Sequence, residues 1–466
     1  MPAVTSNTRG PFKKTSRSAF VNFLRSKYEM YTGALDVQAS PYYLTLEPSD
    51  ICQLRCPTCV TGIENELRRQ KTPDHVIFRD DRSKLSPELF DALLGELGEH
   101  LFFITFYNFG EPLLNKHLPG FIRKASALGI ETDINTNLSL PLSDQFVDDL
   151  LTSGLDYLFA SMDGFTQEAY GTHRVGGNVE LAKANLEKLV RARDRLGLDT
   201  TITYNFLVFR FNEHEVKDAQ QFCDDLGIYF NTRDAFIHRE DWLPTHRTNE
   251  KPVPLPKELE LPAGFGRKER GGAEFWTPLP NITPKPPGRC SWHYGYSSIT
   301  AGGKVTPCCM IPHERYDFGA VVPGQTRFAD VWNNDSYRRS RADWAGKEVK
   351  GLPVQETVCT KCPAPTLLYH LYSFHDCKVL AQSHRLFTGT DPLLAEAFDL
   401  LCRSRYQLST DQLFTSGTFT PPENGLGTED PDDIARFVAF FEQHFLPAAS
   451  GAVAHAGGSQ RQPGGA

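Results

Sequence analysis

The chain has 466 residues, of which 40% are hydrophobic and 23% charged, and its formal net charge is -8 at pH 7. This length is enough for two or three domains with cores of their own. The acidic balance disfavours nucleic acid as a partner, and no segment approaches the roughly 20 apolar residues of a membrane-spanning helix.

The N-terminus contains basic residues but no apolar segment of the kind that a secretory signal carries. We therefore predict a cytoplasmic protein. Residues 1–40 are expected to form an N-terminal arm that is disordered or lies on the surface. Of the eleven cysteines, several stand in closely spaced groups, which in a chain without an export signal indicates metal ligation rather than disulfides.

Strand-like and helix-like segments alternate between residues 41 and 237. The strand candidates are mostly apolar, β-branched or aromatic, as in strands buried on both faces. They cover 42–48, 101–109, 130–137, 155–163, 200–209 and 227–236. Ser86, Ser143 and Asn178 precede helical patterns as start signals. The alternation predicts an α/β fold with a parallel sheet, whose ligands bind at the C-terminal ends of the strands.

The first strand candidate is followed by Cys52, Cys56 and Cys59 in a C-x3-C-x2-C arrangement. A structural zinc site and a fully ligated 4Fe–4S cluster each need four ligands. Three cysteines would leave one iron of a cluster open to a small chelating molecule. On their own they are also compatible with half of a zinc knuckle.

Two further strand candidates are followed by turn-forming and polar residues, namely Gly110, Glu111 and Pro112 after the second and Ser161, Asp163 and Arg174 after the fourth. The glycine permits close backbone approach, and the proline stiffens the turn so that its carbonyl groups can face a ligand's amino group. A guanidinium suits a carboxylate. Taken singly, an ordinary tight turn and a surface ion pair are the simpler interpretations.

Together these motifs resemble the radical S-adenosylmethionine superfamily in order and spacing, over about 43–236. The resemblance implies a partial (β/α)6 barrel. Cys52, Cys56 and Cys59 would bind three irons of a 4Fe–4S cluster, and S-adenosylmethionine would chelate the fourth. The turn of Gly110, Glu111 and Pro112 would contact the cofactor's amino group, Ser161 and Arg174 its carboxylate, with Asp163 as a neighbour.

The same resemblance implies the chemistry. A flavodoxin- or ferredoxin-type donor would reduce the cluster, S-adenosylmethionine would be cleaved, and a 5′-deoxyadenosyl radical would abstract hydrogen from the substrate. Two positions depart from the family's pattern. Phe109 replaces a glycine, and Thr58 stands where an aromatic residue or Met is common, which puts adenine stacking there in doubt.

Residues 238–289 are rich in proline and glycine and predict an extended linker or a lid. Trp242, His246 and Trp276 in this segment are candidates for substrate contact, with an ordinary surface loop as the alternative.

A second cysteine group lies in residues 290–365 and consists of Cys290, Cys308, Cys359 and Cys362. A hairpin turn at 302–303 would deliver Cys308 to a four-thiolate site, as it would in a zinc ribbon. The segment resembles the auxiliary-cluster domain of the SPASM/Twitch subclass, which implies one auxiliary 4Fe–4S cluster. Cys309 could replace Cys308, and Cys377 either ligates or packs.

A helical extension is predicted over 366–446, where it could cap the barrel or mediate dimerisation, and a disordered tail over 447–466. Cys223 and Cys402 fall on apolar helix faces and are predicted to be inert core thiols.

Our main functional hypothesis is a radical S-adenosylmethionine oxidoreductase that acts on a small molecule, such as a sugar or aminocyclitol, and passes an electron to the auxiliary cluster. The few residues before the first strand favour it over a peptide maturase, the alternative. A third hypothesis is an iron–sulfur or zinc protein without radical chemistry. No general base can be named, but Tyr107, Asn108, Asn135 and Asn205 are expected near strand ends facing the cavity.

Overall fold

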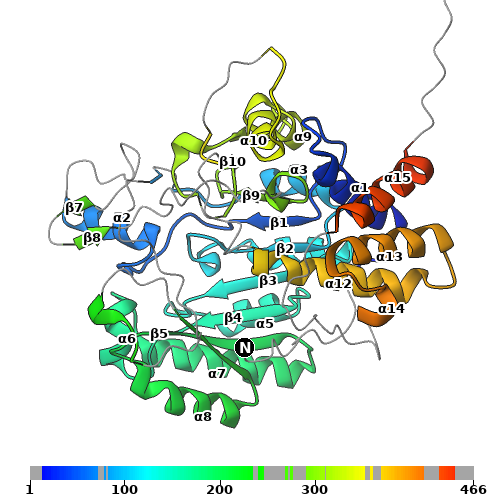
Figure 1. The fold of residues 1–466 in the computed structure, drawn as a ribbon. Coiled ribbons are helices and arrows are strands. Elements are labelled where there is room, and N and C mark those ends of the chain that lie inside the picture. Colours follow the sequence, from blue (N-terminus) through cyan, green and yellow to red (C-terminus); the bar gives the residue numbers. More distant parts are fainter. Residues whose placement is uncertain are drawn as a thin grey trace, which may run out of the picture.

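The computed structural model describes residues 13–71, 78–79, 82–234, 240–245, 268–270, 273–275, 290–309, 311–351, 357–359, 369–413 and 430–446. Six parallel strands form its centre in chain order (Figure 1). They are β1 (Tyr43–Leu46), β2 (Phe103–Thr105), β3 (Glu131–Thr136), β4 (Tyr157–Ser161), β5 (Thr201–Val208) and β6 (Tyr229–Asp234). No backbone pairing joins β1 to β6 within the described ranges, so the six strands form the predicted partial barrel.

Helices connect these strands and cover one face of the sheet (Figure 1). They are α2 (Val60–Arg69), α3 (Pro87–Leu97), α4 (Leu118–Ala127), α5 (Asp144–Leu151), α6 (Gln167–His173), α7 (Val179–Leu196) and α8 (Val216–Leu226). The three predicted start signals are confirmed, because the side chains of Ser86, Ser143 and Asn178 each accept a hydrogen bond from the first turn of their helix.

The two faces of the sheet differ in exposure. On β4, Leu158 and Ala160 are fully buried, whereas Tyr157, Phe159 and Ser161 are partly exposed. Successive side chains of a strand point to opposite faces. The partly exposed set therefore lies on the face that the helices leave open, which we call the inner face.

The second cysteine segment continues the same sheet. β9 (Tyr296–Ile299) pairs in parallel with β1, and β10 (Lys304–Thr306) and β11 (Gly319–Ala320) extend it further, giving a nine-stranded sheet. The predicted hairpin is confirmed by the antiparallel pairing of β9 with β10, and Gly303 supplies the left-handed residue of its turn (φ 83°). The shared sheet was not predicted.

Helices follow in this segment and in the C-terminal extension. They are α9 (Phe328–Trp332), α10 (Asp335–Ala345), α12 (Tyr369–Phe387), α13 (Pro392–Tyr406), α14 (Thr410–Leu413) and α15 (Pro431–Phe445). α12 lies across the start of the barrel strands, where the Lys378 ammonium contacts the carboxylate of Glu131 at 2.5 Å. The extension thus caps the N-terminal end of the barrel, one of the two roles considered for it.

The N-terminal segment differs from the expected arm. α1 (Arg17–Thr32) buries Phe20, Phe23 and Leu24 completely and packs beside α13 and α15 (Figure 1). The basic residues of this segment suggested a surface location, but one of them, Lys27, is itself buried.

A network of buried charges joins α1 to the extension. The Lys27 ammonium lies 2.6 Å from the Asp376 carboxylate, and the Arg405 guanidinium lies 3.3 Å from the same oxygen. The Tyr42 hydroxyl donates to the other oxygen at 2.7 Å. Lys27 and Asp376 are 3% and 2% exposed, so the network is shielded from water.

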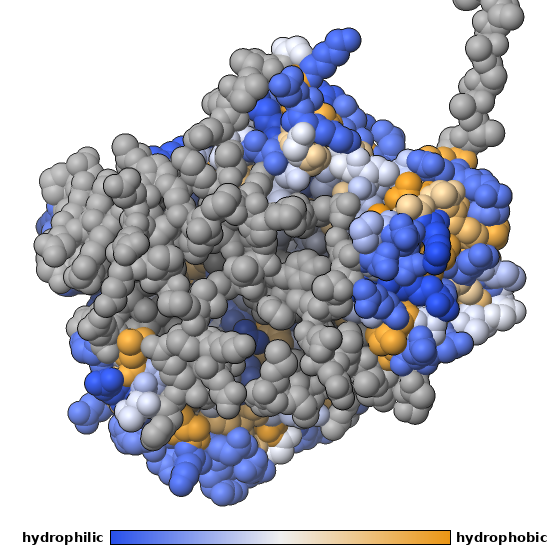
Figure 2. All heavy atoms as spheres, viewed as in Figure 1, coloured by the Kyte–Doolittle hydropathy of each residue, from blue (hydrophilic) through white to orange (hydrophobic). Residues whose placement is uncertain are grey.

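None of the described helices combines the length and hydrophobicity needed to cross a membrane. On the face shown in Figure 2, hydrophilic side chains cover much of the described surface over α8 and α13, with hydrophobic ones scattered among them. Of the predicted linker, the structure describes a short helix (Glu240–Trp242) and the hairpin of β7 (Lys268–Arg270) and β8 (Ala273–Phe275). His246, Trp276, Cys362 and the tail 447–466 lie outside the described residues.

Candidate cofactor site at the strand ends

The three-cysteine loop leads directly from β1 into α2. Cys59 stands at the N-cap of the helix, and Asn65 on its second turn reaches back to the loop. The Asn65 side-chain amide donates to the carbonyl oxygens of Cys52 at 2.9 Å and of Leu54 at 2.8 Å. α2 therefore fixes the course of the loop that carries the thiols.

Gly62 allows the loop to lie directly on α2. A Cβ atom at this position would come within 2.3 Å of the carbonyl oxygen of Cys56 and 2.5 Å of its nitrogen. Both are backbone atoms, so the loop would have to move to make room.

We expect Gly62→Ala to reduce the iron content of the reconstituted protein strongly, because the Cys56 backbone must shift. Gly120→Ala is the matched control, since nothing lies within 4 Å of a Cβ at this helical glycine. Iron and sulfide analysis after anaerobic reconstitution checks the prediction. Equal iron in the two variants would contradict it.

The thiols themselves suit a cluster better than a single ion. Cys52, Cys56 and Cys59 are all free, and within the described part of the chain no three His, Cys, Asp or Glu side chains converge on one ion. In an iron–sulfur cluster each cysteine binds its own iron, so such convergence is not needed. The Leu54 amide and the Asn137 side chain donate to the Cys52 sulfur at 3.5 and 3.8 Å, as polar support for a thiolate.

The Gly110–Glu111 turn packs against the same loop. A Cβ at Gly110 would come within 1.7 Å of the Ser49 carbonyl oxygen, so the glycine is required by the chain's own backbone. The buried Glu111 carboxylate accepts hydrogen bonds from the Thr136 hydroxyl at 2.7 Å and the Asn137 amide at 2.9 Å. No described amide donates to the carbonyl oxygens of 108–110, which leaves these acceptors for a ligand.

Asp163 holds the side chains of Arg174 and His173 beside the cysteine loop. Its carboxylate is fully buried and accepts from Arg174 Nε at 2.6 Å and pairs with His173 Nδ1 at 2.8 Å. Burial alone would raise the pKa of Asp163, but the charge of Arg174 and the hydrogen bond from His173 outweigh it and lower the pKa to about 2. Asp163 is thus an ionised group that positions its neighbours.

Arg174 lies next to one of the thiols. Burial raises the pKa of Cys56 to about 12, and the guanidinium of Arg174 opposes this shift by its charge and a hydrogen bond. His173 Nε2 lies 2.8 Å from the Thr58 hydroxyl, so a chain of contacts runs from the loop to Asp163. Sequence analysis missed His173; its position beside Arg174 was the available signal.

Polar side chains follow at the inner rim of the sheet. The Ser161 hydroxyl donates to the Asn135 side-chain oxygen at 2.5 Å, and Asn231 donates to Asn205 at 3.0 Å. Asn135 stands next to the end of β3, as predicted, whereas Asn205 lies within β5, in register with Ser161. Trp242, a candidate for substrate contact, is instead buried against Phe209 and Phe211.

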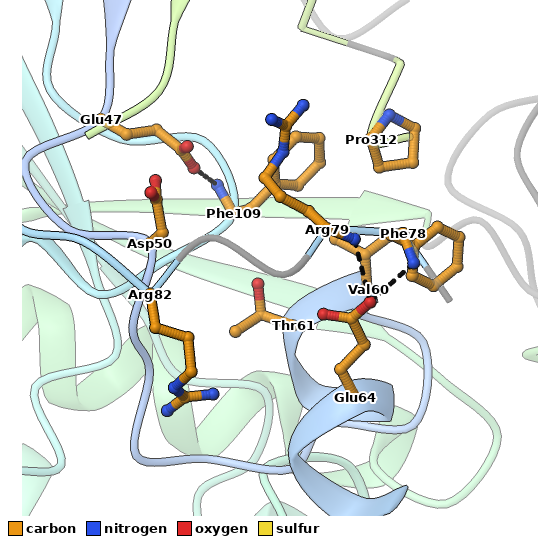
Figure 3. Close-up of a pocket in the computed structure, with 10 residues that line it drawn as sticks. All are labelled: Glu47, Asp50, Val60, Thr61, Glu64, Phe78, Arg79, Arg82, Phe109 and Pro312. Carbon is orange, nitrogen blue, oxygen red and sulfur yellow. Dashed lines mark hydrogen bonds between the residues drawn. The ribbon is translucent and has the colours of Figure 1, made fainter. Parts of the chain in front are cut away.

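A small pocket lies beside the cysteine loop, lined by Glu47, Asp50, Val60, Thr61, Glu64, Phe78, Arg79, Arg82, Phe109 and Pro312 (Figure 3). Burial and the neighbouring Asp50 carboxylate raise the pKa of Glu47 well above its ordinary value. Arg79 forms a two-bonded ion pair with Asp317, each bond 2.8 Å long. The pocket thus lies where the two cysteine segments meet.

The second cysteine group is divided between two environments. Burial raises the pKa of Tyr337, and Cys359 and Cys308 raise it further, which places both thiols near this ring. Cys309 instead contributes to the raised pKa values of Tyr43 and Tyr107, which belong to the barrel. Cys308 and Cys359 thus share Tyr337 as an electrostatic neighbour, and the choice of Cys308 over Cys309 as a ligand stays a prediction.

The remaining thiols differ in burial and in their neighbours. Cys290 is partly buried just before the short helix Ser291–His293. Cys377 is buried in α12, 3.3 Å from the Tyr406 hydroxyl, and packs within the extension. Cys223 and Cys402 are fully buried, as predicted for core thiols.

Comparisons with known proteins match both segments. Residues 46–223 match the model of the radical SAM superfamily, and residues 290–363 match SPASM, an iron–sulfur cluster-binding domain. The chain is similar to the PqqA peptide cyclase of Bradyrhizobium diazoefficiens, with 25% identity over 323 residues, which are 68% of this chain and 80% of that protein.

Two further similarities are more limited. A probable GTP 3′,8-cyclase of Methanococcus maripaludis is 30% identical over 161 residues, 34% of this chain and 51% of that protein. The crystal structure of Streptococcus suis SuiB bound to S-adenosylmethionine aligns with a TM-score of 0.43 and 14% identity, covering 69% of this chain and 72% of that one.

Proposed function

Because the chain belongs to the radical S-adenosylmethionine superfamily and carries a SPASM-type domain, we propose that it is an enzyme that modifies a peptide. Its cofactors are a 4Fe–4S cluster, S-adenosylmethionine and auxiliary iron–sulfur. When bound, the first two supply a radical that abstracts hydrogen from the substrate.

The similarity to PqqA peptide cyclases carries the choice of a peptide. That alignment covers 323 residues, more than the matched superfamily domain alone, whereas the alignment with the GTP cyclase covers 161 residues. The peptide alternative is therefore favoured over the small-molecule hypothesis. The short segment before the first strand, which had favoured a small molecule, is a weaker argument than the similarity over most of the chain.

The chain's own residues have the following proposed roles. Cys52, Cys56 and Cys59 would hold the cluster, and the carbonyl groups beside Gly110 would accept from the amino group of S-adenosylmethionine. Asp163 orients Arg174 through the 2.6 Å contact, so that the remaining guanidinium nitrogens can bind the carboxylate together with Ser161. Cys290, Cys308, Cys359 and Cys362 are the proposed ligands of the auxiliary cluster.

Arg174→Lys is expected to weaken the binding of S-adenosylmethionine about tenfold or more, because an ammonium cannot reproduce the two-sided contact of a guanidinium. The lysine keeps a charge beside Asp163, so the fold is preserved. Arg191→Lys is the control, since Arg191 pairs on the surface with Glu187. Equilibrium dialysis of reconstituted protein measures the affinity; an unchanged value at full iron content would refute the role.

The function is tested with anaerobically reconstituted, dithionite-reduced protein, S-adenosylmethionine, and peptide and small-molecule fractions of the source cells. We expect the peptide fraction to stimulate formation of 5′-deoxyadenosine and to contain a peptide that loses hydrogen mass. Stimulation by the small-molecule fraction alone would overturn the choice of a peptide. No 5′-deoxyadenosine with any fraction, despite full clusters, would overturn the radical chemistry.

A further inference from the structure

Three polar residues of β3 share the inner face but differ in their partners. Glu131, Asp133 and Asn135 alternate along the strand and so point the same way. Glu131 is neutralised by Lys378 at 2.5 Å, and Asn135 is bound by Ser161 at 2.5 Å. No described lysine, arginine or histidine forms an ion pair with the residue between them.

Asp133 is buried without an ion pair in the described part of the chain, and its carboxylate has a hydrogen bond to the uncharged Thr105 side chain. Asp133 is 6% exposed, and its Oδ1 atom is buried without a hydrogen-bond partner. The other buried carboxylates that the structure describes also form an ion pair or accept a hydrogen bond, and Asp50 too has one oxygen, Oδ2, without a hydrogen-bond partner. These other carboxylates are Glu29, Glu47, Asp50, Glu64, Glu111, Glu131, Asp163, Glu215 and Asp376. A buried charge without an ion-pair partner is costly, and its retention calls for a function.

Aromatic rings border the carboxylate on the inner face. Tyr43, Phe103 and Tyr157 form a row, with centroid distances of 5.9 Å and 6.3 Å and nearly parallel planes. Asp133 is paired in register with Tyr157 on β4 and with Thr105 on β2, whose hydroxyl bonds that of Tyr43 at 2.7 Å. We call these three rings the aromatic row.

The chain already binds one cation at this row. Lys378 sits with its ammonium 5.4 Å from the centroid of the Tyr157 ring and contacts Glu131. A cation is attracted both by a carboxylate and by the face of an aromatic ring. Two residues along β3, Asp133 likewise places a carboxylate beside an aromatic ring. No described side chain supplies a cation to it.

We propose that Asp133 and the aromatic row form a subsite for a positively charged side chain, lysine or arginine, of the peptide substrate. The subsite lies two residues, about 7 Å, along β3 from Asn135, which touches the predicted cofactor residue Ser161. A cation held there is close to the site of hydrogen abstraction. This assignment rests on the proposed peptide function and names the substrate class.

The electrostatics of Asp133 agree with this assignment. Burial raises the pKa of Asp133 to about 7, Thr105 lowers it and Asp156 raises it. Tyr43, Tyr107 and Tyr157 are further titratable groups that interact with Asp133. A bound cation would lower this pKa, so binding near neutral pH releases protons.

The test uses reconstituted protein at pH 7 and two probes of equal length, n-butylammonium chloride and n-butanol, in calorimetric titrations. We expect the ammonium probe to bind with proton release, and n-butanol to bind at least tenfold more weakly. We expect the Asp133→Asn variant to bind the two probes with equal affinity. Asp199→Asn is the control that keeps the difference between the probes, because Asp199 is an exposed carboxylate that precedes β5. Equal binding of the two probes to the natural chain, or unchanged binding by Asp133→Asn, would overturn the subsite.

A second measurement guards against a folding artefact. Ionisation of the buried Asp133 carboxylate costs stability. This cost is absent below about pH 4, the ordinary pKa of an aspartate, and complete above about pH 7. The Asp133→Asn substitution removes it. We expect this variant to melt higher than the natural chain at pH 8 and similarly at pH 4.5. A lower melting temperature at pH 8 would show that the carboxylate has a partner already and would overturn the proposal. Formation of 5′-deoxyadenosine in the same preparation tests the radical chemistry separately.

Discussion

Replacing Cys52, Cys56 and Cys59 together by alanine is expected to remove about four irons per chain and all cleavage of S-adenosylmethionine. The three thiols come from one loop, which Asn65 holds against α2 and which Arg174 meets at Cys56. Without them no other described thiol is placed to take over. Iron, sulfide and 5′-deoxyadenosine are measured after identical anaerobic reconstitution.

The matched control is Cys223→Ala, which removes a fully buried thiol of α8 that contacts neither cysteine group. It is expected to keep its iron and its cleavage activity. Cys308→Ala provides a contrast, because it is expected to lower the iron content through the auxiliary site while cleavage persists. Cleavage by the triple variant would refute the assignment of the first loop.

Replacing Asp376 by alanine is expected to destabilise the fold by about 3–5 kcal/mol, the usual cost of leaving a buried partner charge uncompensated. Asp376 faces two cations, Lys27 and Arg405, at 2.6 and 3.3 Å. Burial would raise the pKa of Asp376, but Lys27 and Arg405 lower it below its ordinary value. The contribution of Asp376 to stability is therefore present at neutral pH, and it is lost as the pH falls below the pKa of an ordinary carboxyl group.

Thermal melting at pH 7, with hydrogen exchange of α1 and α12, measures the effect. Asp36→Ala is the control, because Asp36 also pairs with a residue distant in sequence, Arg338, but both side chains are exposed. Such a surface pair contributes less than about 1 kcal/mol. Similar melting of the two variants would show that the buried network adds little to stability.

The barrel could be predicted because its signals are local. Most of the strand candidates are apolar, β-branched or aromatic, and each of Ser86, Ser143 and Asn178 accepts a hydrogen bond from its own helix. The cysteine loop and the turn at Gly110 were recognisable for the same reason, since each motif is contiguous in sequence.

The partnerships between distant residues could not be predicted. Whether a carboxylate on β3 is neutralised depends on Lys378, which lies 247 residues from Glu131. The sequence shows Glu131 and Asp133 as equivalent inner-face residues, yet only the former meets a cation in the described structure. The burial of Lys27 in α1 likewise depends on Asp376, far along the chain.

The pairing of β9 with β1 has a consequence for how the protein is made. The Ala301 amide donates to the Asp50 carboxylate, 251 residues earlier, and β9 covers one whole edge of β1. During synthesis this edge stays open until most of the chain has left the ribosome, and an exposed strand edge invites association with other chains. A fragment ending after β6 would keep that edge permanently exposed. The second cysteine segment therefore also protects an edge of the barrel sheet that is exposed until this segment has been synthesised.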